Sequence, residues 1–348
     1  MIKVAIVGTG GMANNHAVKL SLSAKSEVVA CCDISPERVA EFSKKHNIPE
    51  AYTELSEMLE KCDFDAVSIV TPDPFHAPIA LQALAAGKHV LSEKPLATSV
   101  EDAEKMTAAA KEAGVINMVN FSYRDSSAIQ RAAEMIQAGE LGRIFHVEAH
   151  YLQSWLTSQD WGDWMTSPKW LWRCSTEHGS NGVLGDVGVH ILDFATFPVG
   201  DAESMQCRLH TFDKAPGNQI GEYKLDANDS AMMIVSFKGG AMGSVTTTRM
   251  ATGHRNTVAI TIHGEKGALR IDLDKSYHMI ETCRIGADGK TEPWESHYCP
   301  PTPNIYERFI ASIETGVQDQ PDFARGLAVQ KMLAAATESD RTNQPVTL

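Results

Sequence analysis

The sequence lacks three features, and each absence argues against a class of protein. No apolar run approaches the roughly 20 residues that a membrane-spanning helix needs. Basic residues are scarce, since 31 Lys and Arg stand against 44 Asp and Glu, and the net charge of −13 argues against nucleic acid or an anionic membrane as a partner. The seven cysteines contain no Cys-x-x-Cys pair, and this odd number indicates a reducing cytoplasm rather than a disulfide framework.

The chain is long enough for two domains, because 348 residues with 43% hydrophobic side chains can fill two cores. Short apolar strands alternate with helical stretches in residues 1–122, which predicts an α/β domain with a doubly wound parallel sheet. Residues 123–348 are expected to form a second domain, of the α+β class. Hairpins at 232–248 and 258–273 predict an open, mostly antiparallel sheet there, and the last helix, 324–339, is able to pack back on the first domain.

The first strand, residues 2–7, ends in a turn of the form Gly-x-Gly-x-x-Ala, made of Gly8, Thr9, Gly10, Gly11, Met12 and Ala13. A helix follows. Gly8 allows the tight turn, Gly10 lets a pyrophosphate approach the backbone, and Ala13 keeps the helix close to the strand. The N–H groups and the positive end of the helix then face the phosphates. This arrangement predicts a dinucleotide-binding Rossmann domain.

An acid at the end of the second strand supports the same interpretation. Asp33 follows the strand at 27–32 and is placed where a carboxylate binds the adenosine ribose hydroxyls. The alternative is that Asp33 caps the helix that starts near Pro36. A carboxylate repels a 2′-phosphate, so NAD is expected rather than NADP, although Arg38 could hold that phosphate and leaves NADP open.

Polar residues follow three later strands of the first domain. Thr71, Lys94 and Asn120 all lie at carboxyl ends of strands, so we expect them to face one cleft. Lys94 stands between Glu93 and Pro95, and a lysine in a partly desolvated cleft can act as an acid or a base. A surface lysine paired with Glu93 explains the tripeptide equally well.

Asp186 and His190 are spaced four residues apart in a stretch that predicts a helix, so both side chains are expected on one face. A carboxylate beside an imidazole orients the ring and suits a general base for a hydroxyl group. A merely polar helix face is the usual explanation for such a pair. A metal site with Glu177 or His178 is a further alternative, but the spacing matches no standard ligand set, so no metal is expected.

The stretch 151–173 is rich in aromatic residues, and it holds five of the six tryptophans: Trp155, Trp161, Trp164, Trp170 and Trp172. Aromatic rings with an arginine such as Arg173 can stack on a carbohydrate ring and bind its hydroxyls. A subunit interface is the alternative, because Trp and Arg are enriched there as well.

With these motifs in hand, nearly the whole chain resembles the glucose–fructose oxidoreductase / inositol dehydrogenase family (Gfo/Idh/MocA). The resemblance rests on the glycine turn, Thr71-Pro72 with His76, Glu93-Lys94-Pro95, Trp172-Arg173, Asp186-x-x-x-His190 and Gly326-Leu327-x-x-Gln330. It implies NAD(P)-dependent oxidation of a hydroxyl on a sugar, anhydro-sugar or cyclic polyol. It also implies a homodimer or homotetramer, because the open sheet of such proteins packs against that of another subunit.

The resemblance also implies residue roles. Lys94 contacts the substrate hydroxyl and relays its proton, His190 is the general base, and Asp186 contacts and orients the substrate. The expected cofactor contacts are Gly8, Gly10, Gly11, Met12, Ala13, Asp33, Ile34, Arg38, Thr71, Pro72, His76, Glu93, Lys94 and Asn120. The expected substrate contacts are Lys94, Arg124, Tyr151, Trp155, Trp172, Arg173, Asp186 and His190. The run Tyr151-Leu152-Gln153-x-Trp155 resembles that of members acting on anhydro-sugars such as levoglucosan.

Other dehydrogenase classes lack their signatures here. No tyrosine has a lysine four residues later, which argues against a short-chain dehydrogenase, and the Cys and His ligand set of a zinc alcohol dehydrogenase is absent. Two alternatives remain: a glycoside hydrolase that uses NAD transiently, and a non-catalytic NAD-binding sensor. A sensor has no reason to keep Lys94, Asp186 and His190 together.

Overall fold

The computed structural model describes all 348 residues and divides into two compact units. The first unit comprises residues 1–122 and 303–330, and the second comprises residues 123–302 and 331–348. The boundary after residue 122 coincides with the predicted end of the first domain. Residues 303–330 differ from the expectation, since they belong with the first unit. No helix combines the length and the apolar character that crossing a membrane requires.

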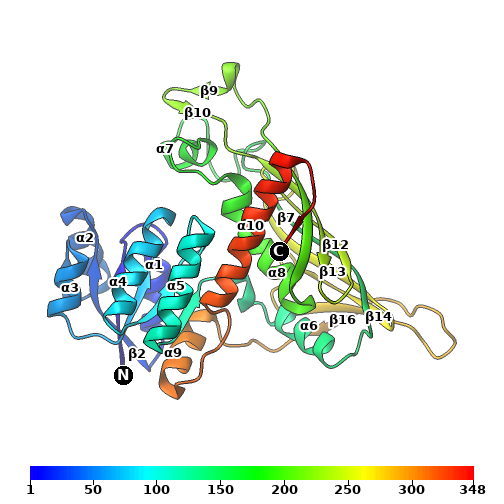
Figure 1. Cartoon of the computed structure of the whole chain (residues 1–348), viewed down its shortest axis with the longest axis horizontal. Helices are drawn as coiled ribbons and strands as arrows, with labels where there is room; N and C mark the ends of the chain where they lie inside the picture. The colour runs from blue at the N-terminus through cyan, green and yellow to red at the C-terminus, as the bar shows by residue number, and fades with distance from the viewer. The chain divides into compact units, whose positions relative to one another are not determined.

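The first unit is built on a parallel sheet of six strands in the order β3-β2-β1-β4-β5-β6. The strands are β1 Ile2–Val7, β2 Ser26–Cys32, β3 Glu50–Tyr52, β4 Ala66–Ile69, β5 His89–Ser92 and β6 Asn117–Val119. The helices are α1 Ala13–Leu22, α2 Pro36–His46, α3 Leu55–Lys61, α4 His76–Ala85, α5 Val100–Ala113 and α9 Ile305–Thr315 (Figure 1). The strand order reverses beside β1, which is where such sheets bind ligands.

Burial explains why residues 303–330 join this unit. Ile305, Tyr306, Phe309 and Ile310 of α9 are all at most 3% exposed and pack into the core that also holds β1 and α1. Four apolar side chains on one face of a helix stabilise its docking by several kcal/mol, at roughly 2 kcal/mol each. The expected second domain therefore contains a segment that completes the first.

The second unit is built on a mixed sheet of nine strands in the order β16-β15-β14-β13-β7-β12-β11-β8-β17. The strands are β7 Ile144–Gln153, β8 Ala202–His210, β11 Ser230–Phe237, β12 Met242–Thr248, β13 Asn256–Gly264, β14 Gly267–Asp272, β15 Met279–Arg284, β16 Glu295–Tyr298 and β17 Val346–Thr347. The expected hairpins are β11 with β12 and β13 with β14. All pairs are antiparallel except β12 with β7.

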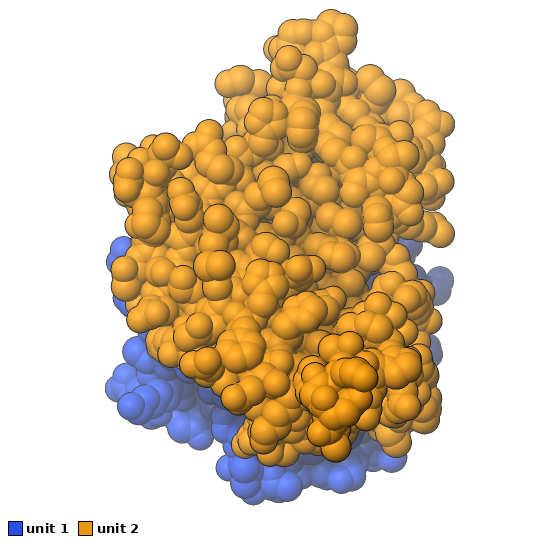
Figure 2. Space-filling view, turned by 90° about the vertical axis from the view of Figure 1, so that its right-hand side faces the viewer, with its two compact units in different colours: residues 1–122, 303–330 blue, residues 123–302, 331–348 orange.

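Helices cover only one face of this sheet. They are α6 Ser127–Gln137 and α8 Val189–Val199, which contact β15 and β7 respectively (Figure 1). The opposite face presents Met232, Ile234 and Met242, which are 64%, 54% and 55% exposed. Because side chains alternate along a strand, the residues between them point into the core. Figure 2 distinguishes the two units by colour, and this sheet belongs to the unit of residues 123–302 and 331–348. The helix α10 Phe323–Thr342 crosses the boundary between the units at Gln330.

Candidate active site

The glycine turn after β1 has the geometry that a dinucleotide requires. Gly8 has a φ of +91°, and a Cβ atom there would lie 2.6 Å from the carbonyl oxygen of Val70, so only glycine fits. A Cβ atom at Gly10 or Gly11 would meet nothing within 4 Å, which leaves open space beside the backbone. Ala13 begins α1 and is completely buried.

Asp33 holds this turn with one carboxylate oxygen and the start of α2 with the other. Its Oδ2 accepts hydrogen bonds from Thr9 N at 2.9 Å and Thr9 Oγ1 at 2.8 Å, and its Oδ1 accepts from Ser35 N at 3.0 Å and Arg38 Nη2 at 2.8 Å. Burial alone would raise the pKa of Asp33, but the bonds from Ser35 and Thr9 bring it below the ordinary value. Ser35 caps α2, so the capping alternative for Asp33 is wrong.

A buried polar cluster underlies Lys94. Glu93 Oε1 lies 2.9 Å from His16 Nε2 and accepts a hydrogen bond from Asn120 Nδ2 at 2.6 Å, while Oε2 accepts from Lys94 N at 3.1 Å. Asn120 Nδ2 also lies 3.2 Å from the hydroxyl of Tyr306. Glu93 was expected to contact the cofactor, but it is only 9% exposed. Its carboxylate instead accepts a hydrogen bond from the backbone of Lys94. Sequence reasoning missed His16 and Tyr306.

The charge on Glu93 has a measurable consequence for stability. Burial would raise the pKa of Glu93, but His16, Lys94 and Asn120 hold it at about 2, below its usual 4.5. Because the folded-state pKa is the lower one, this stabilisation is present at neutral pH and is lost as the pH falls from about 4.5 to 2. We expect Glu93→Gln to lower the free energy of unfolding by a few kcal/mol at pH 7.

The difference in free energy of unfolding between the wild type and Glu93→Gln should shrink on acidification. Denaturant unfolding of both proteins between pH 7 and pH 3 measures it. Glu112→Gln on the exposed side of α5 is the control, since it removes a solvated charge. A Glu93→Gln protein as stable as the wild type at pH 7 would contradict the assignment of this carboxylate as a buried ion.

His76 was expected to contact the cofactor, and the structure buries it completely. Its Nδ1 lies 2.7 Å from the carbonyl oxygen of Pro95, and its Nε2 lies 2.9 Å from that of Thr71. The ring therefore joins the backbone segments that follow β4 and β5.

The open positions of this unit fit a dinucleotide. Beside the free space at Gly10 and Gly11, two buried polar atoms at strand ends, Thr71 Oγ1 and Asn120 Oδ1, have no hydrogen-bond partner in the protein. A buried polar atom of this kind is accounted for when a polar group of a ligand reaches it. Met12 and Ile34, which are 54% and 86% exposed, remain available for contact.

In the second unit, Asp186 and His190 do not lie on one regular α-helix. Leu184–Gly188 forms a turn of π-helix, and α8 begins directly after it. Turns of this kind occur frequently at functional sites. The Asp186 Oδ2 accepts a hydrogen bond from Arg249 Nη2 at 2.9 Å, and the side chain of Asp186 is 35% exposed.

His190 lies against two tyrosines. Its ring centroid is 5.0 Å from that of Tyr123 and 6.4 Å from that of Tyr151. The two tyrosine hydroxyls lie 2.6 Å apart, and Tyr151 donates to Asn256 Oδ1 at 2.8 Å. Burial raises the pKa of Tyr151 well above its usual value, so its hydroxyl stays protonated at neutral pH. Tyr123 and Asn256 escaped the sequence analysis because neither belongs to a motif.

Two expected substrate contacts are corrected. Arg124 is 4% exposed and forms a two-pronged ion pair with Asp193, at 2.8 and 2.7 Å, while its guanidinium stacks on Phe197 at 4.1 Å. It joins the turn at Ser122–Asp125 to α8, and these contacts leave little of the guanidinium for a substrate. Trp155 is 3% exposed and packs in an aromatic core with Trp164, so it has little surface left for a substrate.

Trp172 and Arg173 do lie at the surface. Trp172 is 37% exposed, and the Arg173 guanidinium stacks on Trp172 at 4.5 Å and on Trp170 at 5.3 Å. An exposed indole beside a guanidinium is available for stacking on the ring of another molecule. His178, considered above as a metal ligand, stacks on Tyr223 at 4.3 Å, and the structure contains no cluster of three metal-binding side chains.

The fold and the glycine turn define an NAD-binding oxidoreductase. Residues 2–121 match the oxidoreductase family with an NAD-binding Rossmann fold, and residues 129–270 match the GFO/IDH/MocA C-terminal domain. The chain belongs to the Gfo/Idh/MocA family of oxidoreductases, which confirms the resemblance drawn from its motifs.

Its relatives include sugar oxidoreductases. The chain is 29% identical over 361 residues to the 1,5-anhydro-D-fructose reductase of Ensifer adhaerens, covering 97% of each chain. It is 28% identical over 298 residues to the levoglucosan dehydrogenase of Pseudarthrobacter phenanthrenivorans, covering 79% of this chain and 74% of that one. A solved structure of levoglucosan dehydrogenase with NADH and levoglucosan superposes with a TM-score of 0.87, at 26% identity over 99% of both chains.

Proposed function

We propose that the protein oxidises a hydroxyl group of a sugar, an anhydro-sugar or a cyclic polyol. The observation that carries this proposal is the placement of His190 beside Tyr123 and Tyr151 in an NAD-binding oxidoreductase. Asp186, which pairs with Arg249, is close enough for its charge to act on Tyr151. Several neutral hydroxyl and amide groups around one imidazole suit a substrate made of hydroxyl groups. Two relatives are named for anhydro-sugars, which makes this the first substrate class to test.

The residues divide the work of the reaction. When bound, NAD supplies the hydride acceptor at C4 of its nicotinamide. His190 takes the proton of the substrate hydroxyl as general base. Lys94 donates a hydrogen bond to that hydroxyl and relays the proton, while Asp186 orients the substrate. Trp172 and Arg173 are proposed to stack on the sugar ring and bind its other hydroxyls.

The cofactor preference follows from Asp33. A carboxylate ionised at neutral pH at the end of β2 favours the ribose hydroxyls of NAD and repels the 2′-phosphate of NADP. The side chain of Arg38 is 58% exposed and already pairs with Asp33, so it is oriented toward the acid rather than toward a phosphate. We therefore propose NAD as the working cofactor.

The deciding experiment measures NADH formation from a panel of anhydro-sugars, inositols and aldoses, with NAD and NADP compared at equal concentration. A dehydrogenase accumulates NADH in proportion to the substrate consumed. A redox-assisted glycoside hydrolase releases sugar from a glycoside without accumulating NADH, so glycosides belong to the panel. A sensor binds NADH and turns over nothing, and that result would overturn the proposal.

We also propose a homodimer or homotetramer that buries the open sheet face. Met232, Ile234 and Met242 form an exposed apolar patch on adjacent strands, and patches of this kind mark interaction surfaces. A charge in the middle of a packed face is costly. Ile234→Lys is therefore expected to convert the oligomer to monomers in sedimentation velocity.

The control for this change is Val317→Lys, which places the same charge on an apolar side chain that is 67% exposed in the first unit. It should sediment like the wild type. A monomeric wild type, or an Ile234→Lys protein that keeps its oligomeric state, would show that the sheet face is not the interface.

The thiols support a proposed cytoplasmic location. All seven cysteines are free, and six of them are buried. Burial raises the pKa of Cys31 to about 12 and that of Cys32 to about 11, so both stay protonated and unreactive. Unpaired core thiols are the cysteine usage of a reducing compartment.

A further inference from the structure

Arg249 is the bulkiest of the fully buried side chains, with an exposed fraction of 0%. It follows directly after β12 and belongs to no motif in the sequence. A buried guanidinium is costly unless its donors meet acceptors and its charge meets an opposite charge. The acceptors of the Arg249 guanidinium therefore show which parts of the chain it holds together.

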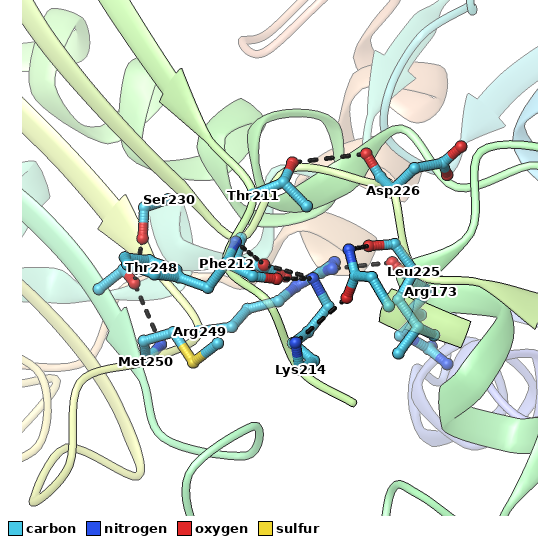
Figure 3. A network of polar contacts seen from close by, with 12 residues as sticks. Arg173, Thr211, Phe212, Lys214, Leu225, Asp226, Ser230, Thr248, Arg249 and Met250 are labelled. Atoms are coloured by element: carbon cyan, nitrogen blue, oxygen red, sulfur yellow. Dashed lines mark hydrogen bonds and ion pairs between the residues drawn. The ribbon is translucent and has the colours of Figure 1, made fainter. Parts of the chain in front are cut away.

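Those acceptors surround the proposed site. Arg249 Nη1 donates to the carbonyl oxygen of Arg173 at 2.8 Å (Figure 3), while Nη2 donates to the carbonyl oxygen of Gly182 at 3.3 Å and to Asp186 Oδ2 at 2.9 Å. Its guanidinium also lies over the ring of Trp155 at 5.1 Å. One buried cation thus joins both ends of the loop 173–182 to the carboxylate that follows it.

The backbone of Arg249 is also held in place by hydrogen bonds, next to the strands of the sheet. Arg249 N donates to the carbonyl oxygen of Asp229 at 2.9 Å, and its own carbonyl accepts from Leu156 N at 3.3 Å. The preceding strand, β12, lies in the interior of the sheet between β11 and β7. Asp186, by contrast, lies outside the sheet in the π-helical turn Leu184–Gly188.

A second buried ion pair nearby shows what a purely structural pair looks like. Lys214 Nζ lies 2.6 Å from Asp229 Oδ2, with the two side chains 1% and 0% exposed, and it donates to the carbonyl oxygen of Phe212 at 3.0 Å (Figure 3). Both partners of that pair are sealed. In the Arg249 pair the cation is buried, while the side chain of Asp186 is 35% exposed and can be reached from solvent.

We propose that Arg249 is a positioning residue, which fixes the Asp186 carboxylate in direction and charge so that its exposed side meets the substrate. The inference rests on the proposed function, because it acts through Asp186. A misplacement of about 1 Å in a site can cost about 100-fold in rate. The reaction should therefore depend on a side chain that itself never touches the substrate.

The test is removal of the guanidinium and its return from solution. Arg249→Ala is expected to lower kcat by about 100-fold, with NADH affinity unchanged, in assays with NAD and levoglucosan, myo-inositol or D-glucose. Guanidinium at millimolar concentration, far below denaturing levels, should restore part of kcat by filling the vacated site. Arg249→Lys should recover less than the added guanidinium, because a point charge cannot meet three acceptors on one plane.

The matched control is Lys214→Ala, which breaks the other buried ion pair and should lower stability without any rescue by guanidinium. A double-mutant cycle with Asp186→Asn completes the design. If Arg249 acts through Asp186, its removal costs less than about 3-fold once Asp186 is neutral, because the two effects are not additive.

The outcomes separate two kinds of failure. A wild type that oxidises none of the probes refutes the proposed function and this inference with it. An active wild type whose Arg249→Ala form keeps its kcat, gains nothing from guanidinium, or shows an additive cycle refutes the inference alone. An active Lys94→Ala protein refutes only the assigned proton relay, and a non-additive cycle between Arg249 and Asp186 would then still support the inference.

Discussion

Lys94→Ala is expected to abolish oxidation of the substrate while the protein still binds NADH. Glu93 holds the backbone of Lys94 at 3.1 Å, and His16 and Asn120 hold Glu93, so the lysine projects from a rigid base. A positioned proton donor contributes about 10²- to 10⁴-fold to a rate. In the proposed mechanism, the substitution removes both the proton relay and one hydrogen bond to the substrate. We expect kcat/KM to fall by at least about 10³-fold.

The measurement is steady-state NADH formation together with NADH binding by fluorescence titration. Lys105→Ala is the control, because Lys105 lies 52% exposed on α5 and pairs with Glu101 there. The control should match the wild type in both assays. Undiminished turnover by Lys94→Ala would refute the mechanism, and loss of NADH binding would reassign Lys94 to the cofactor site.

Local patterns in the sequence were sufficient to predict the fold of residues 1–122, the larger part of the first unit. The glycine turn, the strand that precedes it and Asp33 lie within one stretch of the chain, and the spacing of such a unit is dictated by the ligand that it holds. α2, Pro36–His46, begins at the predicted residue, because its cap and its apolar face are both local. The docking of α9 could not be predicted in this way, since an amphipathic helix does not specify which apolar surface receives it.

The second unit shows where local patterns fail. Arg124 and Arg249 are both arginines near the site, but only their distant partners, Asp193 and Asp186, give them their roles. A single sequence contains no local signal for such pairs. The π-helical turn at Leu184–Gly188 was missed for a related reason, because an insertion of this kind keeps the apolar pattern of a helix.

The burial of individual tryptophans limits which of them can serve either of the two roles considered for the stretch 151–173. The aromatic stretch was expected to be either a sugar platform or an interface, and the structure divides it. Trp155 and Trp164 are at most 7% exposed and form a core, while Trp172 is 37% exposed. Only an exposed ring is available to a sugar or to a second subunit, so Trp172 with Arg173 remains the candidate for either role.

His190→Asn is expected to have the second large effect, and its signature is a change in pH dependence. Asparagine keeps a polar side chain of similar length but accepts no proton near neutral pH. A general base must be unprotonated to act, so the wild-type rate should fall as the solution is acidified through the range in which histidine titrates. With His190 replaced, kcat/KM should fall by about 10²- to 10⁴-fold, and this acid limb should disappear.

The pH profile separates a base from a residue that only packs. His190 touches Tyr123 and Tyr151, and loss of packing alone would lower the rate at every pH and leave the acid limb in place. His210→Asn is the control, since His210 stacks on Phe212 at the surface and should leave the profile unchanged. An acid limb that survives in His190→Asn would assign the proton to another group, and the tyrosine pair beside His190 would be the next place to look.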